Sequence, residues 1–173
     1  RCVFGVPSDI LAKQERELAD MLSKSGVKEC LFVNRAMAAL IGAGYSPCIS
    51  AIVVDIGAGS TEVMVLHRGD ILHQKRSAIG GEDFDKAVKQ YIADQGDVNV
   101  SLSVSKAIKE RLGAVWQGRA EETIDIEGTL ALTGNRVKMS ISTEDIVGVF
   151  EKPLRDLLTA VSDGVQKIPS EFV

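Results

Sequence analysis

The stretch Asp55-Ile56-Gly57-Ala58-Gly59-Ser60-Thr61-Glu62-Val63 decides the fold class of this 173-residue chain. It completes the apolar run 51–56, which predicts a strand in the middle of a sheet that is covered on both faces. The two glycines allow a tight turn whose backbone N–H groups can point toward an anion. A second apolar run follows the turn. The stretch therefore predicts a strand, a phosphate-binding turn and another strand in an α/β protein.

The polar side chains of this stretch suit a phosphate and a magnesium ion. Asp55, at the end of the strand, can hold a hydrated Mg²⁺, which uses few carboxylates. Ser60 and Thr61 can donate hydroxyl groups to phosphate or orient water. The alternative is a plain glycine-rich hairpin turn with a capping aspartate. No Gly-Lys-Ser/Thr follows, so the stretch is no Walker A loop, and the strand that follows excludes a Rossmann fingerprint.

A second glycine motif lies downstream, at Ile79-Gly80-Gly81-Glu82-Asp83-Phe84-Asp85. By itself it predicts a helix that starts after a flexible bend. Its acidic beginning suits the positive end of a helix dipole. Together with the first loop, it forms a far more specific combination than either motif alone.

Hydrophobic spacing predicts the remaining elements. Strands are expected at 3–6, 30–33, 51–56, 61–66, 71–77, 123–126 and 137–141. Helices are expected from a cap at Pro7-Ser8-Asp9 to Ser25 and at 36–43, 82–93 and 104–112, with a last helix running from a Ser142–Asp145 capping box to about 165. Gly26 is expected to end the first helix, and Arg68-Gly69-Asp70 predicts a hairpin turn between 61–66 and 71–77. Residues 95–100 predict a loop, and Pro153 predicts a kink in the last helix.

Composition excludes several classes of function. The formal net charge is -4, and Lys and Arg are scattered, which argues against a nucleic-acid-binding surface. No apolar run approaches the roughly 18–20 residues that span a bilayer. The three cysteines form no CxxC pair and predict buried thiols in a reducing cytoplasm. The chain begins without Met, directly in an expected strand, so we expect it to be a fragment of a longer protein.

The two glycine motifs resemble the second phosphate loop and following helix of the actin, sugar kinase and heat-shock chaperone superfamily. Within it, the chain as a whole resembles the MreB family of bacterial actin-like proteins. The similar stretches are Val6-Pro7-Ser8, Ala36-Met37-Ala38-Ala39, Ile41-Gly42-Ala43-Gly44 and Val53-Val54-Asp55-Ile56-Gly57.

The resemblance implies an actin-like (ribonuclease H-like) lobe of a two-lobed ATPase, with a mixed sheet flanked by helices. The core subdomain would comprise 1–79 and 142–173, and 80–141 would form a smaller inserted α+β subdomain. ATP and Mg²⁺ would be the cofactors, with Asp55 and Thr61 as catalytic residues and Asp55 holding Mg²⁺ through water. The implied nucleotide contacts are Gly57, Ala58, Gly59, Ser60, Thr61, Gly80, Gly81, Glu82 and Lys109.

Three positions depart from the family pattern. Asn34-Arg35-Ala36 stands where the family has Glu-Glu-Pro, so Arg35 occupies the position of a water-polarising glutamate. Ala58 replaces a usual glycine, and Arg111 replaces a glutamate that helps to hold adenosine. These departures make nucleotide binding a weaker expectation than the fold, and hydrolysis a weaker one than binding.

The function implied by the resemblance is that of an ATP-binding, filament-forming cytoskeletal protein that maintains rod shape by organising cell-wall synthesis. Its partners would be further copies of itself, together with cell-wall synthesis and membrane proteins. It would be cytoplasmic and reach the membrane through parts outside this chain. The alternatives are a non-polymerising ATPase related to chaperones or sugar kinases, and a pseudo-ATPase scaffold, which Asn34-Arg35-Ala36 favours.

Overall fold

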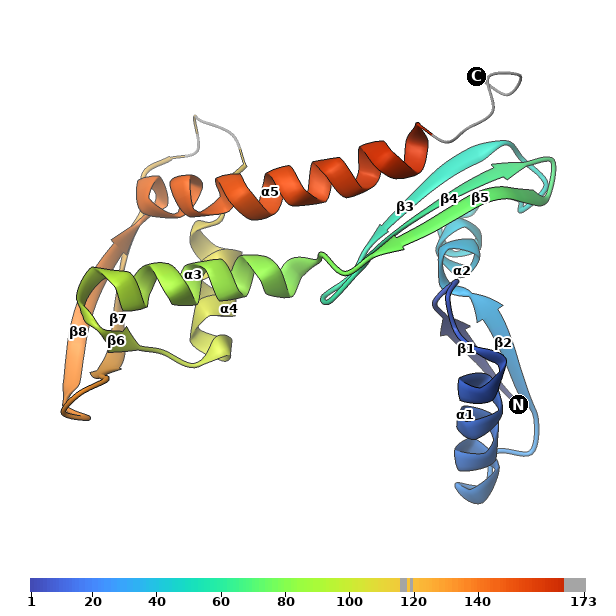
Figure 1. Cartoon of the computed structure of the whole chain (residues 1–173), viewed down its shortest axis with the longest axis horizontal. Helices are drawn as coiled ribbons and strands as arrows, with labels where there is room; N and C mark the ends of the chain where they lie inside the picture. Colours follow the sequence, from blue (N-terminus) through green and yellow to red (C-terminus); the bar gives the residue numbers. More distant parts are fainter. Residues whose placement is uncertain (116–117, 119, 167–173) are drawn as a thin grey trace. The chain divides into compact units, whose positions relative to one another are not determined.

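The computed structural model describes residues 1–115, 118 and 120–166. The chain forms two compact units, of which the first comprises 1–78 with the chain from 159 onward and the second comprises 79–158 (Figure 1). The division falls inside the last helix, α5 (Thr143–Val165). The predicted subdomain boundaries, with 142–173 in the core, stay a prediction, and 167–173 lie outside the described residues.

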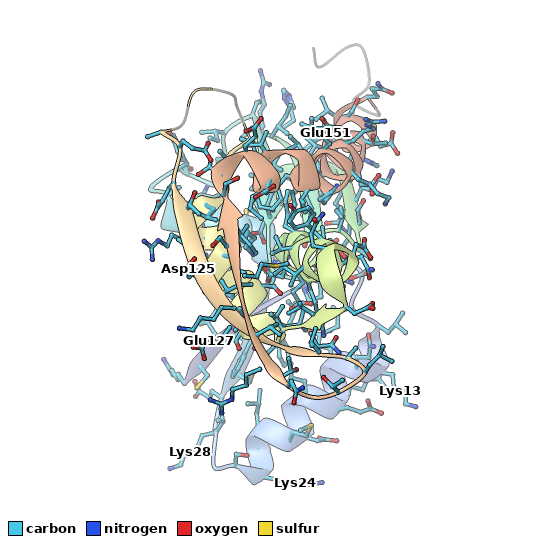
Figure 2. All side chains as sticks on the ribbon, turned by 90° about the vertical axis from the view of Figure 1, so that its left-hand side faces the viewer. Lys13, Lys24, Lys28, Asp125, Glu127 and Glu151 are labelled. Atoms are coloured by element: carbon cyan, nitrogen blue, oxygen red, sulfur yellow. The ribbon has the colours of Figure 1, made fainter. Side chains whose placement is uncertain are left out.

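The first unit begins with a parallel pair of strands. Strands β1 (Cys2–Val6) and β2 (Cys30–Asn34) are in register from Cys2 opposite Cys30 to Val6 opposite Asn34. Parallel strands need a crossover connection, and helix α1 (Ala12–Lys24) provides it. None of the residues of α1 is buried, and Figure 2 shows Lys13 and Lys24 projecting from it.

The predicted cap of helix α1 is wrong in its position. The helix begins at Ala12, and the backbone N–H of Leu11 donates to the side chain of Gln14 at 3.0 Å. Ser8 and Asp9 lie before the helix and have long-range partners instead. The predicted glycine after the helix is confirmed, since Gly26 has φ 90°.

The second sheet of this unit is antiparallel, in the order β3-β4-β5. Strand β3 (Ala51–Ile56) pairs with β4 (Thr61–His67), which pairs with β5 (Asp70–Ser77). The prediction that 51–56 lies in the middle of a covered sheet is therefore wrong. The central strand is β4, whose residues Thr61 to Leu66 are all buried, whereas β3 is an edge strand with Ile52 and Val54 exposed.

The predicted hairpin turn between 61–66 and 71–77 is confirmed. Arg68 and Gly69 have φ angles of 51° and 97°. Two successive positive φ angles are the mark of the tight turns that match the twist of a hairpin. Helix α2 (Arg35–Gly42) follows β2 directly and contacts β3 and β4. A small core joins these elements, made of Ala36, Leu40, Met64 and Leu66.

The second unit combines three helices with one antiparallel sheet. Its elements before α5 are α3 (Gly81–Gly96), β6 (Val98–Asn99), α4 (Leu102–Leu112), β7 (Thr123–Leu130) and β8 (Arg136–Ser142). The sheet order is β6-β7-β8. Its buried core is Val88, Ile92, Val98, Val100, Ile108, Leu112, Ile126, Ile141, Ile146 and Phe150.

Two predictions for this unit have clear outcomes. The loop expected at 95–100 is wrong, because α3 continues to Gly96 and 98–99 pair with β7. The capping box is confirmed: Asp145 N donates to Ser142 Oγ at 3.2 Å, and Ser142 N donates to Asp145 Oδ2 at 2.9 Å. The kink at Pro153 stays a prediction. Over the described part of the chain, no helix combines the length and the apolar character needed to cross a membrane.

Candidate functional site

The predicted turn lies between β3 and β4. The backbone N–H of Gly57 donates to the carbonyl of Ser60 at 2.9 Å and closes the turn. A Cβ atom on Gly57 would lie 3.2 Å from that carbonyl oxygen, so the close approach favours glycine. Ala58 and Gly59 are exposed at the tip, whereas Ser60 and Thr61 are buried. The tip therefore offers backbone to solvent, and the contacts of the two hydroxyl groups with phosphate stay a prediction.

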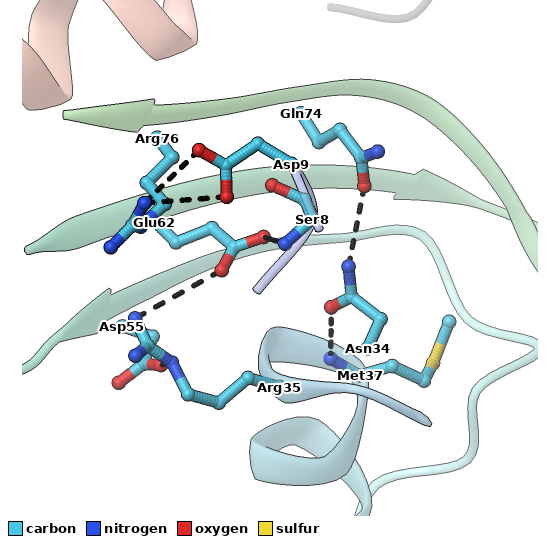
Figure 3. Close-up of polar contacts among 9 residues, drawn as sticks. All are labelled: Ser8, Asp9, Asn34, Arg35, Met37, Asp55, Glu62, Gln74 and Arg76. Carbon is cyan, nitrogen blue, oxygen red and sulfur yellow. Dashed lines mark hydrogen bonds and ion pairs between the residues drawn. The ribbon is translucent and has the colours of Figure 1, made fainter. Parts of the chain in front are cut away.

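Asp55, at the end of β3, forms an ion pair with Arg35 (Figure 3). Arg35 is the first residue of α2, and its Nε donates to Asp55 Oδ2. The side chains are 34% and 23% exposed, so the pair is partly shielded from water. A cation at the start of a helix faces the positive end of the dipole, and the Asp55 carboxylate offsets this repulsion.

A second carboxylate, that of Glu62, lies near this ion pair and was not predicted from the sequence. The side chain of Glu62 on β4 is fully buried. Its Oε1 accepts a hydrogen bond from the backbone N–H of Ser8 at 3.1 Å, and its Oε2 lies 3.9 Å from Nη2 of Arg35 (Figure 3). A buried charge is costly unless it is paired, so Arg35 and Ser8 together compensate Glu62. In the sequence, Glu62 is an acidic residue in a largely apolar strand, and this pattern could have indicated a buried charge.

The guanidinium group of Arg35 lies directly beside the turn. A Cβ atom built on Gly57 would be 3.8 Å from Nη1 and 3.9 Å from Nη2. Nη2 is buried and has no hydrogen-bond partner, and the same holds for Oε2 of Glu62. The cluster of Arg35, Asp55 and Glu62 thus places one positive charge and two negative charges around the start of the predicted phosphate loop.

The predicted Mg²⁺ does not fit this arrangement of donors. Oδ2 of Asp55 is bound to the guanidinium group of Arg35, a permanent cation that also lies beside Gly57, so a second cation at this carboxylate would be repelled. Glu62 is buried and directed at Ser8 and Arg35. Among the described residues, no group of three or more His, Cys, Asp or Glu side chains is arranged to hold a metal ion.

Asn34, the first residue of the Asn34-Arg35-Ala36 stretch that departs from the family pattern, is a helix cap. Its Oδ1 accepts from the backbone N–H of Met37 at 3.1 Å, and its Nδ2 donates to Gln74 at 3.3 Å (Figure 3). An N-cap of this kind typically contributes about 1 kcal/mol. Asn34 therefore positions the start of α2, and with it Arg35.

The second glycine motif lies in the other compact unit, where it begins helix α3. Gly80 N–H donates to Asp83 Oδ2 at 2.9 Å, so this backbone donor already has an internal partner. Partial burial would raise the pKa of Asp83, but this hydrogen bond and the nearby Lys86 outweigh it and hold the pKa below its ordinary value. The predicted roles of Gly80, Gly81 and Glu82 in binding a nucleotide stay predictions.

Lys109 and Arg111 on α4 have partners within the second unit. Nζ of Lys109 lies 2.7 Å from the buried Asp85 and donates to the carbonyl of Gly81 at 3.0 Å. Nε of Arg111 donates to Glu122 at 2.7 Å. The Lys109 contacts join α4 to the first turn of α3, and a nucleotide would have to compete with them.

Acidic side chains on β7 have similar local partners. Asp125 accepts from Ser140 at 2.7 Å, and Glu127 lies 3.7 Å from Lys138. Figure 2 shows Asp125 and Glu127 on the strand. Both pairs connect β7 with β8 and stabilise the sheet.

Comparison with known proteins supports one family throughout the chain. The MreB/Mbl protein family model matches residues 1–173. The cell shape-determining protein MreB of Escherichia coli K12 is 26% identical over 174 residues, covering 99% of this chain and 50% of the relative. The cell shape-determining protein Mbl of Bacillus subtilis 168 is 23% identical over 175 residues, covering 99% of this chain and 52% of the relative.

Solved structures confirm the predicted actin-like fold. MreB5 of Spiroplasma citri bound to ADP superposes with a TM-score of 0.90 at 21% identity, covering 98% of this chain and 52% of that one. The MamK double helical filament gives a TM-score of 0.74 at 23% identity, covering 98% and 51%. The chain spans about half the length of the relatives that it matches. On the match over its whole length, the chain belongs to the MreB/Mbl protein family.

Proposed function

We propose that this chain is part of an ATP-binding, filament-forming bacterial actin homologue that maintains rod cell shape by organising cell-wall synthesis. The observation that carries the proposal is the MreB/Mbl match over all 173 residues. Similar proteins are described as cell shape-determining, as bound to ADP or AMPPNP, and as a double helical filament. We place the intact protein in the cytoplasm, assembling with its own copies and with cell-wall synthesis and membrane proteins.

The turn 57–60 is the proposed phosphate-binding element of the first unit. Its exposed tip presents the backbone of Ala58 and Gly59, and the guanidinium group of Arg35 lies beside Gly57. Backbone N–H groups in a glycine-rich turn and a nearby arginine are both suited to phosphate oxygens. Gly80, Gly81, Glu82 and Lys109 are proposed as further contacts from the second unit.

A nucleotide-binding scaffold that does not hydrolyse ATP is the second candidate. The specific observation in its favour is the pairing of Arg35 with Asp55. An attacking water needs a hydrogen-bond acceptor, and a guanidinium group offers only donors. In this candidate, nucleotide binding and assembly are kept while turnover is lost.

The proposal is tested by nucleotide binding to the intact protein. We expect fluorescent ATP and ADP analogues to bind, and Ala58→Asp to weaken that binding by about tenfold or more, because a carboxylate at the tip repels phosphate. Ala131→Asp is the matched control, since Ala131 is exposed in a hairpin turn of the second unit. The affinity of Ala131→Asp for the nucleotide analogues should equal that of the wild type.

Assembly is measured in parallel, by sedimentation and electron microscopy of the same samples. Filaments of the wild-type protein are expected. The absence of any nucleotide binding would overturn the ATP-binding part of the proposal, and monomers under all conditions would overturn the filament part. Equal loss of binding in Ala58→Asp and Ala131→Asp would show that the turn 57–60 is not the binding element.

A further inference from the structure

We propose that Arg35 replaces the divalent metal ion as the cation at the phosphate loop, so that this protein binds nucleotide without requiring Mg²⁺. The inference deepens the proposed function and rests on it. It begins from a disagreement: a member of this family is expected to hold a metal near Asp55, and the donors found there do not fit one.

The guanidinium group of Arg35 lies at the start of the turn. The guanidinium nitrogens Nη1 and Nη2 of Arg35 come within 3.8 and 3.9 Å of the place that a Cβ on Gly57 would fill. Asp55, the residue expected to anchor the metal through water, accepts from Nε of the same side chain. The positive charge therefore occupies the space between the strand-end carboxylate and the first residue of the turn.

The charges around the start of the turn also require a cation. Asp55 and Glu62 bring two negative charges to the start of a loop that has to receive an anion. Without a cation, these carboxylates would repel phosphate. Arg35 is within ion-pair distance of both, so it reduces the repulsion that a metal ion would otherwise have to offset.

The guanidinium group of Arg35 has the donors that a phosphate group needs. Arginine carries five N–H donors in a planar fork that suits phosphate oxygens, and it is always charged. In Arg35, Nε is bound to Asp55, but Nη2 has no hydrogen-bond partner. Nη2 is buried on the side of Glu62, whereas Nη1 of the same guanidinium group lies 3.8 Å from the place of a Gly57 Cβ and is the nitrogen proposed to face the phosphate.

Hydrogen bonds from neighbouring residues hold Arg35 and Glu62 in position. Asn34 caps the first turn of α2 and so fixes the residue that follows it. Glu62 is held by the backbone N–H of Ser8. With both of its carboxylate neighbours in place, the guanidinium group is positioned before any ligand arrives, which lowers the entropy lost on binding.

The test compares ATP binding by the intact protein in excess MgCl₂ and in excess EDTA. For the wild type we expect the two dissociation constants to agree within about threefold. For Arg35→Met we expect binding in EDTA to be at least about tenfold weaker than in the wild type, with recovery in MgCl₂ because Asp55 is then unpaired. Arg35→Lys, which keeps the charge, should stay tolerant of EDTA.

Arg16→Met is the matched control, because Arg16 is an exposed arginine on α1. It should behave as the wild type in both buffers. Wild-type binding that is strong in MgCl₂ and lost in EDTA would overturn the metal-replacement inference and leave the proposed function intact. Wild-type protein that binds ATP in neither buffer would overturn both. The wild-type comparison holds even where a variant fails to fold.

Discussion

Arg35 is the cation at the proposed phosphate loop. The chain places a permanent cation where relatives of its family are expected to carry an acidic side chain, and Asp55 and Glu62 surround it. Oδ2 of Asp55 is therefore bound to Nε of Arg35.

Phosphate release should accordingly be independent of Asp55. We expect the intact wild-type protein and its Asp55→Asn variant to release phosphate from ATP at rates that agree within about threefold, because general-base assistance, worth on the order of 10²–10⁴-fold, is absent from both. A colorimetric phosphate assay under saturating ATP measures this. Wild-type release that exceeds the variant's by tenfold or more would contradict the scaffold candidate and make Asp55 a working acceptor.

Tyr91 and Asp145 form a hydrogen-bonded pair in the second unit, and the pKa values of both groups are shifted. The hydroxyl group of Tyr91 donates to Asp145 Oδ1 at 2.7 Å. Burial and this carboxylate raise the pKa of Tyr91 to about 12. The hydrogen bond from Ser142 N–H, with those from Tyr91 and the Ser142 hydroxyl, outweighs partial burial and lowers the pKa of Asp145.

These shifts fix the pH window in which the pair stabilises the fold. Because the pKa of Asp145 is lowered by folding, its contribution to stability is present above the pKa that it has in the unfolded chain, about 3.9. The contribution is lost as the pH falls through the pKa of Asp145 in the folded protein. The raised pKa of Tyr91 gives stability that is present below about 10 and lost as pH rises through about 12. The contribution should therefore be constant between about pH 5 and 9.

Tyr91→Phe tests this contribution. We expect a loss of about 1 kcal/mol in the free energy of unfolding at pH 7, measured by urea denaturation, since the pair is only partly buried. The difference between the wild type and Tyr91→Phe should shrink below pH 4. A difference that stays constant down to pH 2 would show that the loss does not come from the hydrogen bond to the Asp145 carboxylate.

At the scale of elements, helix α5 contains two internal glycines in opposite surroundings. A Cβ on Gly148 would meet nothing within 4 Å, whereas a Cβ on Gly164 would lie 2.7 Å from Cβ of Val63 on β4 and 2.9 Å from each of its methyl groups. Val63 is 1% exposed and belongs to the buried central strand, so it has little room to move.

The two glycines therefore form a matched pair of Gly→Ala changes. Gly148→Ala should raise the free energy of unfolding by about 0.5–1 kcal/mol, because alanine is the better helix former. Gly164→Ala should lower it by about 1–3 kcal/mol, because the new methyl group overlaps Val63. Urea denaturation of both variants measures the effects. A stabilising Gly164→Ala would show that the end of α5 does not pack on β4 in solution.

At the scale of the whole molecule, the described residues form two separate cores. Met64 belongs to the core of the first unit and Ile92 to that of the second, and both side chains are 0% exposed. The two units are distinct by their contacts, although α5 belongs to both. Chains that contain more than one core commonly depart from a single cooperative unfolding transition.

Calorimetry of the 173-residue chain should therefore show two transitions. Met64→Ala and Ile92→Ala each remove a large buried side chain, at a typical cost of about 2–5 kcal/mol. We expect each to lower one transition and to leave the other nearly unchanged. One transition, lowered equally by both substitutions, would show that the units unfold together.

Local sequence patterns predicted most of the secondary structure. The glycine at φ 90° after α1, the tight turn at Arg68-Gly69 and the capping box at Ser142 were all predicted, because each depends on residues within a few positions of one another. The wrongly predicted start of α1 shows that local patterns fail where residues far along the chain intervene. Ser8 and Asp9 are good capping residues, but Glu62 and Arg76 engage them from far along the chain.

The sequence alone determined the α/β class, the family and the position of the glycine turn, since these follow from the order of apolar runs and short motifs. Only the tertiary structure decided which strand is central and what Asp55 binds. A continuous apolar run does not reveal whether β3 has one neighbour or two. The sequence also does not show that Arg35 lies beside Asp55, 20 residues away, and Glu62, 27 residues away. Such long-range pairs form because a buried charge must find an opposite charge, wherever along the chain folding has brought one near.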